Sequence, residues 1–384
     1  MHLLPHPPPT GAGYGCSCGA AALEVLAPPC SHFWNSVPPE PSTGGAESPA
    51  GQVGQGAWQH APSSVGRVTS RPDSPLTLSV PTGEARELLA RHLADLEFDA
   101  EIVVWDGHGP APEAAGRIAL FTGLYNAPPP PREVFAALPA LQVIQLLSAG
   151  VEPWLPVVPE GVVLCNGRGI HGSSTAELAI GGLLALLRDL PAYLDAQREG
   201  RWHRLESRGL AGQRVLVLGA GDIGRRIGAV AETLDAEVTY VARTERVGIR
   251  ALADVPELLP DHHVVVVALP LTPETERIVD AGFLAAMPDG AALVNISRGR
   301  HVDTDALVEQ LRQRRLRAFL DVTDPEPLPE DHPLWEVPNL ILTPHVGGGT
   351  AGWDDRAYEL VAEQAQRLRD GGTDALANRV DGGY

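Results

Sequence analysis

The sequence predicts an α/β protein in which a doubly wound parallel sheet is inserted in a smaller parallel-sheet domain, behind a disordered N-terminal extension. Three observations lead to this prediction. The chain has 384 residues, 44% of them apolar, which is enough for two or three domains with buried cores. From residue 76 onwards, short apolar runs alternate with helical segments, as in a series of βαβ units. Before that point Pro and Gly are frequent and no apolar periodicity is present.

The extension covers residues 1–74. It contains 12 Pro and 10 Gly, so that 22 of its 74 residues favour irregular chain. The apolar patch in AAALEVLA has no partner face nearby, and an isolated helix of one or two turns is unstable. We therefore expect this segment to be disordered.

The smaller domain is expected over residues 75–171. Its strand candidates are LTLSV, EIVVW, IALFTG, LQVIQLL and VVLCN, and EARELLARHLADL is a helix candidate. Short apolar runs of this kind are typical of the buried strands of a parallel sheet. The next segment, TAELAIGGLLALLRDL at 175–190, is apolar over most of its surface. We expect it to form a helix that Thr175 caps and that is buried between the two domains.

The second domain is expected over residues 172–347. Six apolar runs predict its strands: RVLVL, AEVTYV, HVVVVAL, AALVNI, RAFLDV and NLILT. Helical segments such as DIGRRIGAVAETL and DTDALVEQLRQRR lie between them, which favours a doubly wound parallel sheet. The last helix candidate, WDDRAYELVAEQAQRLRD, falls in residues 348–384, which we expect to return to the smaller domain.

Composition excludes several classes of function. The chain has 48 acidic and 29 basic residues, a net charge of −19, and no basic run, so nucleic acid is not an expected partner. All 29 basic residues are Arg, which excludes Schiff-base chemistry and a P-loop lysine. No uncharged apolar run is long enough to cross a membrane, and the four cysteines fit a reducing, cytoplasmic setting. Cys16 and Cys18 have no second pair of ligands at zinc spacing, so no metal site is expected.

One glycine-rich turn indicates a dinucleotide. VLVLGAGDIGRRIG contains Gly219, Gly221 and Gly224 in GxGxxG spacing, after an apolar strand and at the start of a helix. In this context Gly219 makes the tight turn, Gly221 lets a pyrophosphate approach the backbone, and Gly224 lets helix and strand pack. The N–H groups at the helix N-terminus can then bind the phosphates. The second domain is therefore predicted to be a Rossmann dinucleotide-binding domain.

Further motifs lie on either side of this turn. They are SAGVE at 148–152, ALPLTPET at 268–275, LVNISRG at 293–299, LDVTDPEP at 320–327 and PLWEVPNLILTPHVGGGT at 333–350. With the glycine turn, they resemble the D-isomer-specific 2-hydroxyacid dehydrogenases in order and spacing. The resemblance implies a flavodoxin-like substrate domain and hydride transfer between NAD(P)H and a small 2-keto or D-2-hydroxy acid. It also implies a catalytic triad of Arg298, Glu326 and His345.

The implied triad would perform acid–base chemistry. An alcohol releases hydride only if its proton leaves too, so a base that titrates near neutral pH is needed, and the imidazole of His345 is suitable. Glu326, hydrogen-bonded to the other ring nitrogen, would favour the imidazolium form that ketone reduction needs. Arg298 would hold the substrate carboxylate in a planar fork. Taken singly, each of the three would be interpreted as an ordinary loop or surface residue, and it is the ordered set of motifs that favours the triad. The glycines beside His345 offer no ligands for a metal.

The resemblance also implies which residues contact the ligands. The SAGVE motif corresponds to the family's substrate-carboxylate loop, which indicates Ala149 and Gly150 as neighbours of the substrate together with Arg298. Cofactor contacts are implied for Gly219, Gly221, Asp222, Ile223, Gly224, Leu269, Pro270, Thr275, Ser297, Asp321 and Gly347. Tyr125 and Asn126 either face the substrate or form a Pro-rich turn.

The end of the second Rossmann strand indicates which dinucleotide is used. NAD-using domains place an acidic residue there, about 20 residues after the glycines, to bind the ribose hydroxyls. This chain has Ala242, followed by Arg243 and Thr244. Because Arg243 can pair with a 2′-phosphate and Thr244 can donate to it, we expect NADP to be preferred, with NAD as the alternative. Arg246 is a weaker candidate because Glu245 lies beside it.

Several branches of the family fit the sequence poorly. Formate-oxidising relatives carry Gln where this chain has Glu326, phosphite-oxidising relatives use a lysine, and the substrate loop has no Arg cluster for a phosphate. A small unphosphorylated 2-keto acid such as glyoxylate, hydroxypyruvate or an aryl or alkyl pyruvate remains. The alternative function is a dinucleotide-sensing binding protein of the C-terminal-binding corepressor type, with the same fold and triad but little turnover.

The resemblance implies a homodimer that pairs through the cofactor domain. We expect the apolar helix at 175–190 to form part of that interface. Trp202 and Trp335 match family positions and are expected to be packing residues.

Overall fold

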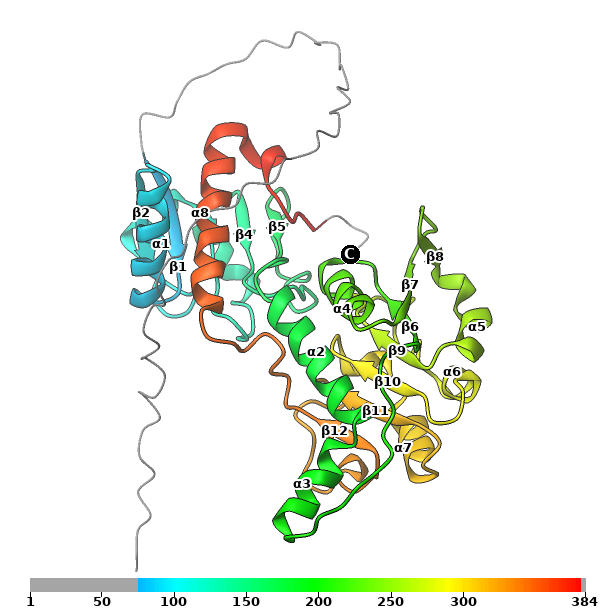
Figure 1. The fold of residues 1–384 in the computed structure, drawn as a ribbon. Helices are drawn as coiled ribbons and strands as arrows, with labels where there is room; N and C mark the ends of the chain where they lie inside the picture. The colour runs from blue at the N-terminus through cyan, green and yellow to red at the C-terminus, as the bar shows by residue number, and fades with distance from the viewer. Residues whose placement is uncertain (1–74, 381–384) are drawn as a thin grey trace, which may run out of the picture. The chain divides into compact units, whose positions relative to one another are not determined.

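The computed structural model describes residues 75–380 of the chain (Figure 1). Within this range two parallel sheets are present, each formed from its own stretch of sequence. The predicted fold class, a Rossmann domain combined with a smaller parallel-sheet domain, is confirmed. The extension predicted to be disordered, residues 1–74, lies outside the described residues, as does the segment 381–384.

The smaller sheet has five parallel strands in the described part of the chain, in the order β2-β1-β3-β4-β5. This strand order is the flavodoxin-like one. The elements are β1 (Leu76–Val80), α1 (Gly83–Asp95), β2 (Ala100–Val104), η1 (Glu113–Arg117), β3 (Ile118–Phe121), η2 (Arg132–Ala137), β4 (Val143–Gln145) and β5 (Val163–Cys165).

The last helix of the described chain belongs to the core of this sheet. α8 (Trp353–Gly371), followed by η7 (Gly372–Ala375), packs against α1 and β1. Its buried residues Tyr358 and Val361 lie in the same apolar cluster as Leu78 of β1 and Leu89 of α1. Residues from both ends of the described chain therefore complete one core.

The larger sheet has seven parallel strands over residues 214–342, in the order β12-β11-β10-β9-β6-β7-β8. Six of these strands are the predicted ones, and β8 is additional. β8 has only three residues at the sheet edge and an exposed Arg250 in its centre, so it lacks an apolar run. The elements are β6 (Arg214–Leu218), α4 (Asp222–Thr233), β7 (Glu237–Ala242), β8 (Ile249–Ala251), η3 (Leu252–Asp254), α5 (Val255–Leu258), η4 (Leu259–Asp261), β9 (Val264–Val267), α6 (Ala281–Ala286), β10 (Ala292–Asn295), η5 (Gly299–His301), α7 (Thr304–Arg312), β11 (Arg317–Leu320), η6 (Pro333–Trp335) and β12 (Leu340–Leu342).

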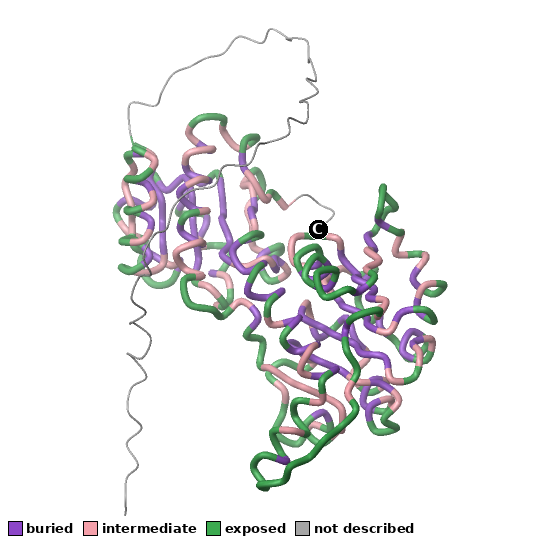
Figure 2. The backbone as a smooth tube through the Cα atoms, in the orientation of Figure 1, coloured by how far each residue is buried: buried purple, intermediate pink, exposed green. Residues whose placement is uncertain are grey.

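Helices bury the central strands of the larger sheet on both faces (Figure 2). Alternate residues of β9 lie in two different apolar clusters, Val265 with residues of α6 and α7, and Val264 with residues of α2 and α4. This is why the strand reads as an unbroken apolar run. Among the helices of the described chain, none is both long enough and apolar enough to cross a membrane.

α2 (Gly172–Leu187) packs against α4 and the strands of the larger sheet. The prediction that Thr175 caps this helix is wrong. The helix begins three residues earlier, with His171 as its cap residue, and the backbone N–H of Thr175 donates to the His171 carbonyl at 2.9 Å. It ends before residue 190, because Asp189 has a left-handed φ of 53° and starts a separate helix, α3 (Leu190–Arg198).

The expectation that Trp202 and Trp335 are packing residues is also wrong. Trp202 is 96% exposed and lies in the segment 199–213, which contains no helix or strand. Trp335 is 54% exposed, and its indole N–H donates to the carbonyl of Pro329 at 2.7 Å. Neither ring fills the core of this chain.

Candidate active site

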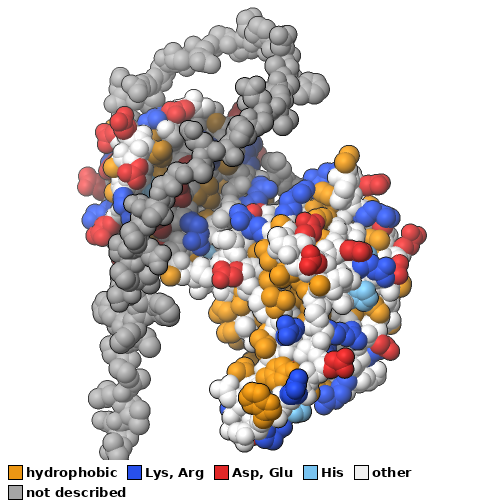
Figure 3. All heavy atoms as spheres, in the orientation of Figure 1, with side chains coloured by type: hydrophobic (Ala, Val, Ile, Leu, Met, Phe, Trp, Pro, Cys, Tyr) orange, Lys and Arg blue, Asp and Glu red, His pale blue; other side chains and the backbone are white. Residues whose placement is uncertain are grey.

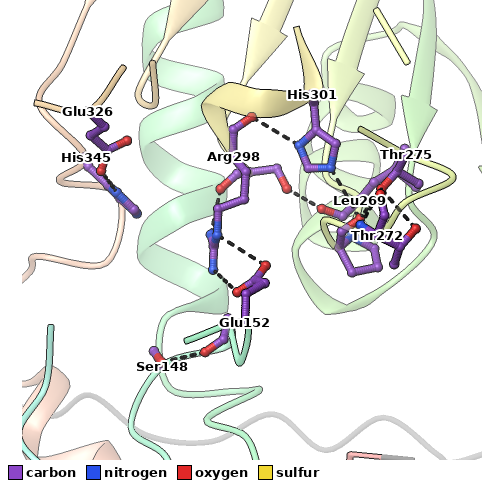
Figure 4. A network of polar contacts seen from close by, with 12 residues as sticks. Ser148, Glu152, Leu269, Thr272, Thr275, Arg298, His301, Glu326 and His345 are labelled. Carbon is purple, nitrogen blue, oxygen red and sulfur yellow. Dashed lines mark hydrogen bonds and ion pairs between the residues drawn. The ribbon is translucent and has the colours of Figure 1, made fainter. Parts of the chain in front are cut away.

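His345 lies just beyond the carboxyl end of β12, at the sheet edge where open α/β sheets bind ligands. Its Nδ1 is 2.5 Å from Oε1 of Glu326, on the loop after β11 (Figure 4). This hydrogen bond lowers the pKa of Glu326 more than burial raises it. His345 also has a left-handed φ of 53°, which is uncommon for a residue other than glycine and recurs at functional sites. Two of the three predicted triad members are therefore in contact.

We expect Glu326→Gln to remove a pH-dependent part of the protein's stability. The pKa of Glu326 is lower in the folded protein than in the unfolded chain, so its ionised form stabilises the fold above the ordinary carboxyl pKa of about 4.3. This stabilisation is lost as the pH falls through the pKa of Glu326 in the folded protein. The side chains of His345 and Glu326 are 43% and 41% exposed, so solvent screens the pair. The free energies of unfolding of wild type and Glu326→Gln should therefore differ by less than about 1 kcal/mol. Urea unfolding from neutral pH to about pH 3, below the ordinary carboxyl pKa, measures this difference.

Glu330→Gln, on the same loop and exposed, is the matched control for this experiment. The free energies of unfolding of wild type and Glu326→Gln should differ near neutral pH and converge at low pH. A difference that grows as the pH falls would contradict the assignment.

A buried carboxylate shapes the loop that carries His345. Asp321 is 2% exposed, and its carboxylate accepts hydrogen bonds from the backbone N–H of Val346 and of Gly347, each at 2.9 Å. It also accepts from the hydroxyl of Thr343 at 2.6 Å. The Asp321 carbonyl accepts from the N–H of His345 at 2.7 Å. The sequence indicated Asp321 and Gly347 as cofactor contacts, and the structure brings them together beneath the histidine.

Arg298 follows β10 and extends toward the SAGVE loop (Figure 4). Its Nη1 donates to the carbonyl of Ser297 at 2.7 Å, and its Nη2 lies 3.5 Å from Oε2 of Glu152. A Cβ on Gly150 would lie 1.5 Å from Nη2, so only glycine leaves room for the guanidinium there. Ala149 and Gly150, the predicted substrate residues, therefore lie beside Arg298. Glu152 was not singled out from the sequence, although it ends the SAGVE motif.

All three triad residues line one cavity of about 630 Å³, which we call the larger cavity. Its other lining residues include Tyr125 and Asn126, for which the sequence left open whether they face the substrate or form a Pro-rich turn. Tyr125 stacks on His171 at a centroid distance of 4.9 Å and lies 4.4 Å from the ring of Trp353. Apolar wall residues of this cavity are Leu124, Pro128, Leu146, Pro153 and Trp154.

The glycine turn has the shape that a dinucleotide needs. Gly219 has φ of 112°, and a Cβ there would lie 2.2 Å from the carbonyl oxygen of Ala268. A Cβ on Gly224 would lie 1.9 Å from the carbonyl oxygen of Gly219, so strand and helix approach as closely as backbone permits. At Gly221 a Cβ would meet no described atom within 4 Å. The turn is closed on the sheet side and open at Gly221, which fits a pyrophosphate.

A second cavity of about 470 Å³, the smaller cavity, adjoins this turn and shares Gly150, Glu152 and Arg298 with the larger one. The predicted cofactor residues that line it are Gly221, Asp222, Ile223, Leu269, Pro270 and Ser297. Among the described residues, Arg243, Thr244 and Thr275 line neither cavity. Because the two cavities share lining residues, the glycine turn and the three predicted triad residues border adjoining parts of one site.

A hydrogen-bond network supports the lining of the smaller cavity (Figure 4). The hydroxyl of Ser297 donates to the carbonyl of Leu269. The hydroxyl of Thr275 donates to the carbonyl of Pro270 at 2.7 Å, so this threonine orders its own loop. The ring nitrogens of His301 lie 3.1 and 3.2 Å from the carbonyls of Arg298 and Pro270, and burial lowers the pKa of His301. The network ties the backbone of Arg298 to the 269–275 loop.

His171 is a further residue of the site that sequence reasoning missed. Its Nε2 lies 2.9 Å from the carbonyl of Leu147, and its Nδ1 lies 3.1 Å from the carbonyl of Gly348. It thus links the chain before the SAGVE loop to the loop after His345. Burial lowers the pKa of His171 and keeps the ring neutral near pH 7. No spacing in the sequence connects these segments, so only the fold reveals the contact.

The site combines an open glycine turn at the carboxyl edge of a Rossmann sheet with an Arg and a paired His and Glu in an adjoining cavity. Such a combination defines a nicotinamide-dependent oxidoreductase.

No group of three or more His, Cys, Asp or Glu that could hold a metal is present in residues 75–380.

Comparison with known proteins agrees with this class. Residues 180–347 match the family model described as D-isomer specific 2-hydroxyacid dehydrogenase, NAD binding domain. Hydroxyphenylpyruvate reductase of Plectranthus scutellarioides is 35% identical over 228 residues, which are 57% of this chain and 72% of that protein. Human glyoxylate reductase/hydroxypyruvate reductase is 31% identical over 290 residues, 70% of this chain and 86% of that protein.

A solved structure leads to the same family. The D-isomer specific 2-hydroxyacid dehydrogenase from Xanthobacter autotrophicus Py2, in complex with NADPH and MES, has a TM-score of 0.69 and 29% identity. The match covers 80% of this chain and 98% of that one. The chain belongs to the D-isomer specific 2-hydroxyacid dehydrogenase family. It is an NAD(P)-dependent dehydrogenase that acts on the CH–OH group of 2-hydroxy acids, and these relatives give no support to the corepressor alternative.

Proposed function

We propose that this protein reduces a small, unphosphorylated 2-keto acid to the D-2-hydroxy acid, with Arg298, Glu326 and His345 as its catalytic residues. The observation that carries the proposal is the 2.5 Å contact between His345 and Glu326 in the same cavity as Arg298. Each residue type supplies one requirement of the reaction: a fork for a carboxylate, a proton donor, and an anion that stabilises the protonated donor.

The residues act on the substrate as follows. Arg298 binds the carboxylate and orients the keto group, and the nicotinamide cofactor supplies the hydride. His345, whose Nδ1 contacts Glu326, uses its other ring nitrogen to donate a proton to the keto oxygen. Glu326, ionised because its pKa is lowered, stabilises the imidazolium before this transfer. In the direction of oxidation the neutral His345 accepts the alcohol proton.

The lining of the larger cavity supports a keto acid with an uncharged side chain. Leu124, Pro128 and Trp154 provide apolar walls. Acidic residues of the lining outnumber the two arginines, Arg298 and Arg300; they are Glu152, Asp321, Asp324 and Glu326. A second anionic group on the substrate would be repelled there. Relatives named for glyoxylate, hydroxypyruvate and hydroxyphenylpyruvate reduction span the range of side chains to test.

The deciding experiment is a panel of 2-keto acids assayed with NADPH and with NADH. We expect turnover with at least one monocarboxylic 2-keto acid. Purified protein that binds a dinucleotide but reduces no member of the panel would overturn the proposal.

We also propose that NADPH is preferred over NADH. The support is the end of β7, where Ala242 stands in place of an acid and exposed Arg243 and Thr244 follow. The pKa of Glu274 is lowered mainly by a hydrogen bond with Thr272 and in smaller part by the charge of Arg243. The charge of Arg243 thus acts on Glu274, which follows the segment 268–271 that lines the smaller cavity. The Xanthobacter relative was solved with NADPH.

The proposal includes a homodimer, with a different surface from the expected one. α2 is mostly buried within its own chain, with ten buried residues of 16. Exposed apolar side chains instead follow it: Leu190 and Leu194 of α3, then Trp202 and Leu205. Figure 3 shows hydrophobic side chains gathered where α3 lies. Light scattering at micromolar concentration tests this, and a monomer would contradict it.

A cytoplasmic location completes the proposal. Its support is Cys165, a free and buried thiol, as a reducing compartment maintains. Cell fractionation tests it.

A further inference from the structure

Each nitrogen of the Arg298 guanidinium has a polar neighbour in this structure. Nη1 donates to the carbonyl of Ser297 at 2.7 Å. Nη2 lies 3.5 Å from Oε2 of Glu152, and Nε lies 3.5 Å from Oε1 of the same side chain (Figure 4). The Nε and Nη2 edge is one of the two edges through which Arg can bind a carboxylate in a bidentate manner, and Nη1 of the other edge already donates to Ser297. Glu152 therefore faces the edge that a substrate carboxylate would use.

This ion pair is a loose one. Charge-assisted bonds between guanidinium and carboxylate are normally about 2.7 to 2.9 Å long, well below the 3.5 Å found here. Oε1 of Glu152 is buried and has no hydrogen-bond partner among the residues that the structure describes. A carboxylate oxygen in that position is poorly compensated. Glu152 can therefore leave Arg298 at small cost.

The SAGVE loop brings the carboxylate of Glu152 and the guanidinium of Arg298 together. Gly150 leaves the space against which Nη2 lies, and Glu152 follows two residues later on the same loop. The carboxylate of Glu152 and the guanidinium of Arg298 both border the larger and the smaller cavity. The side chain of Arg298 is 33% exposed and that of Glu152 is 27% exposed, so a ligand in either cavity can reach the pair.

We propose that Glu152 is a positioning and specificity-determining residue that occupies the place of the substrate carboxylate on Arg298 until substrate binds. Glu152 holds the guanidinium of Arg298 over Gly150, and the substrate carboxylate displaces it from Arg298. After the exchange it remains in the cavity as a negative charge, beside Asp321 and Asp324, and so disfavours substrates with a second anionic group. The inference rests on the proposed role of Arg298 as the carboxylate-binding residue.

The test compares wild type with Glu152→Gln, which keeps the shape of the side chain, and Glu152→Ala, which removes it. Glu160→Gln is the matched control, because Glu160 is exposed and lines neither cavity. Thermal unfolding establishes that each variant is folded. The probe is oxamate, an unreactive monoanionic analogue of a 2-keto acid, titrated by calorimetry with and without saturating NADPH.

We expect oxamate to bind about twofold to fivefold more tightly to Glu152→Gln than to wild type, the range for loss of a partly exposed ionic competitor. In steady-state assays the change should appear in KM rather than in kcat. The fall in KM should be greater for a 2-keto dicarboxylate than for a monocarboxylate. Glu160→Gln should match wild type.

Two results would overturn the proposed role of Glu152. If Glu152 instead holds Arg298 in its working orientation throughout, both Glu152 variants bind oxamate more weakly and raise KM. Unchanged oxamate affinity would also overturn the inference. Tighter oxamate binding without turnover of any keto acid would support the inference and overturn the proposed function, so the two are separately testable.

Discussion

His345→Gln is expected to lower turnover of a 2-keto acid by a factor of about 10² to 10⁴, the range for loss of a general acid–base group. Affinity for the dinucleotide should change little, because His345 lines the larger cavity and not the smaller one next to the glycine turn. Stopped assays with saturating cofactor give kcat, and quenching of protein fluorescence gives the dissociation constant of NADPH.

The backbone at this position calls for a second variant. His345 has a left-handed φ of 53°, which asparagine tolerates better than glutamine does. His345→Asn should show the same loss of turnover with less strain. If either folded variant keeps kcat within about twofold of wild type, His345 is not the proton donor that the mechanism requires.

Arg243→Ala is expected to reduce the preference for NADPH over NADH by about tenfold to a hundredfold, which corresponds to one charge-assisted contact of roughly 1.5 to 3 kcal/mol. The measurement is the ratio of kcat/KM for the two cofactors. Arg312→Ala is the matched control, because Arg312 is an exposed residue of α7 and lines neither cavity. Equal use of both cofactors by wild type, or an unaltered ratio in Arg243→Ala, would show that Arg243 does not bind the 2′-phosphate.

Sequence patterns predicted the strands well because parallel strands are buried on both faces. Val264–Val267 reads as a strand without any knowledge of its neighbours, since each of its residues needs an apolar environment. β8 lacks that signal, because it is short, at an edge and centred on exposed Arg250. The start of α2 was misplaced because Gly172 and the serines after it have low helix propensity, and tertiary packing outweighs this preference.

The sequence predicted the site residues that belong to motifs. It did not predict contacts between residues that are far apart in the sequence. Arg298, Glu326 and His345 stand in motifs that the sequence displays. The pair of Arg298 and Glu152 joins residues 146 positions apart, and the contact of His171 with Gly348 spans 177 positions. No local pattern encodes such partners, because either residue alone has an ordinary interpretation as a loop residue.

The contribution of α8 to the first sheet has a consequence for how the chain folds during synthesis. Val361 and Tyr358 fill the same core as Leu78 and Leu89, so this core lacks an essential part until the final helix has left the ribosome. At about 5 to 20 residues per second, the early strands wait on the order of ten seconds or more for their last partner. The intervening domain has all its strands by residue 342 and can fold meanwhile. Of the two sheets, the one whose strands are translated first is thus the one whose core is completed last, and its strands need protection from aggregation in the interval.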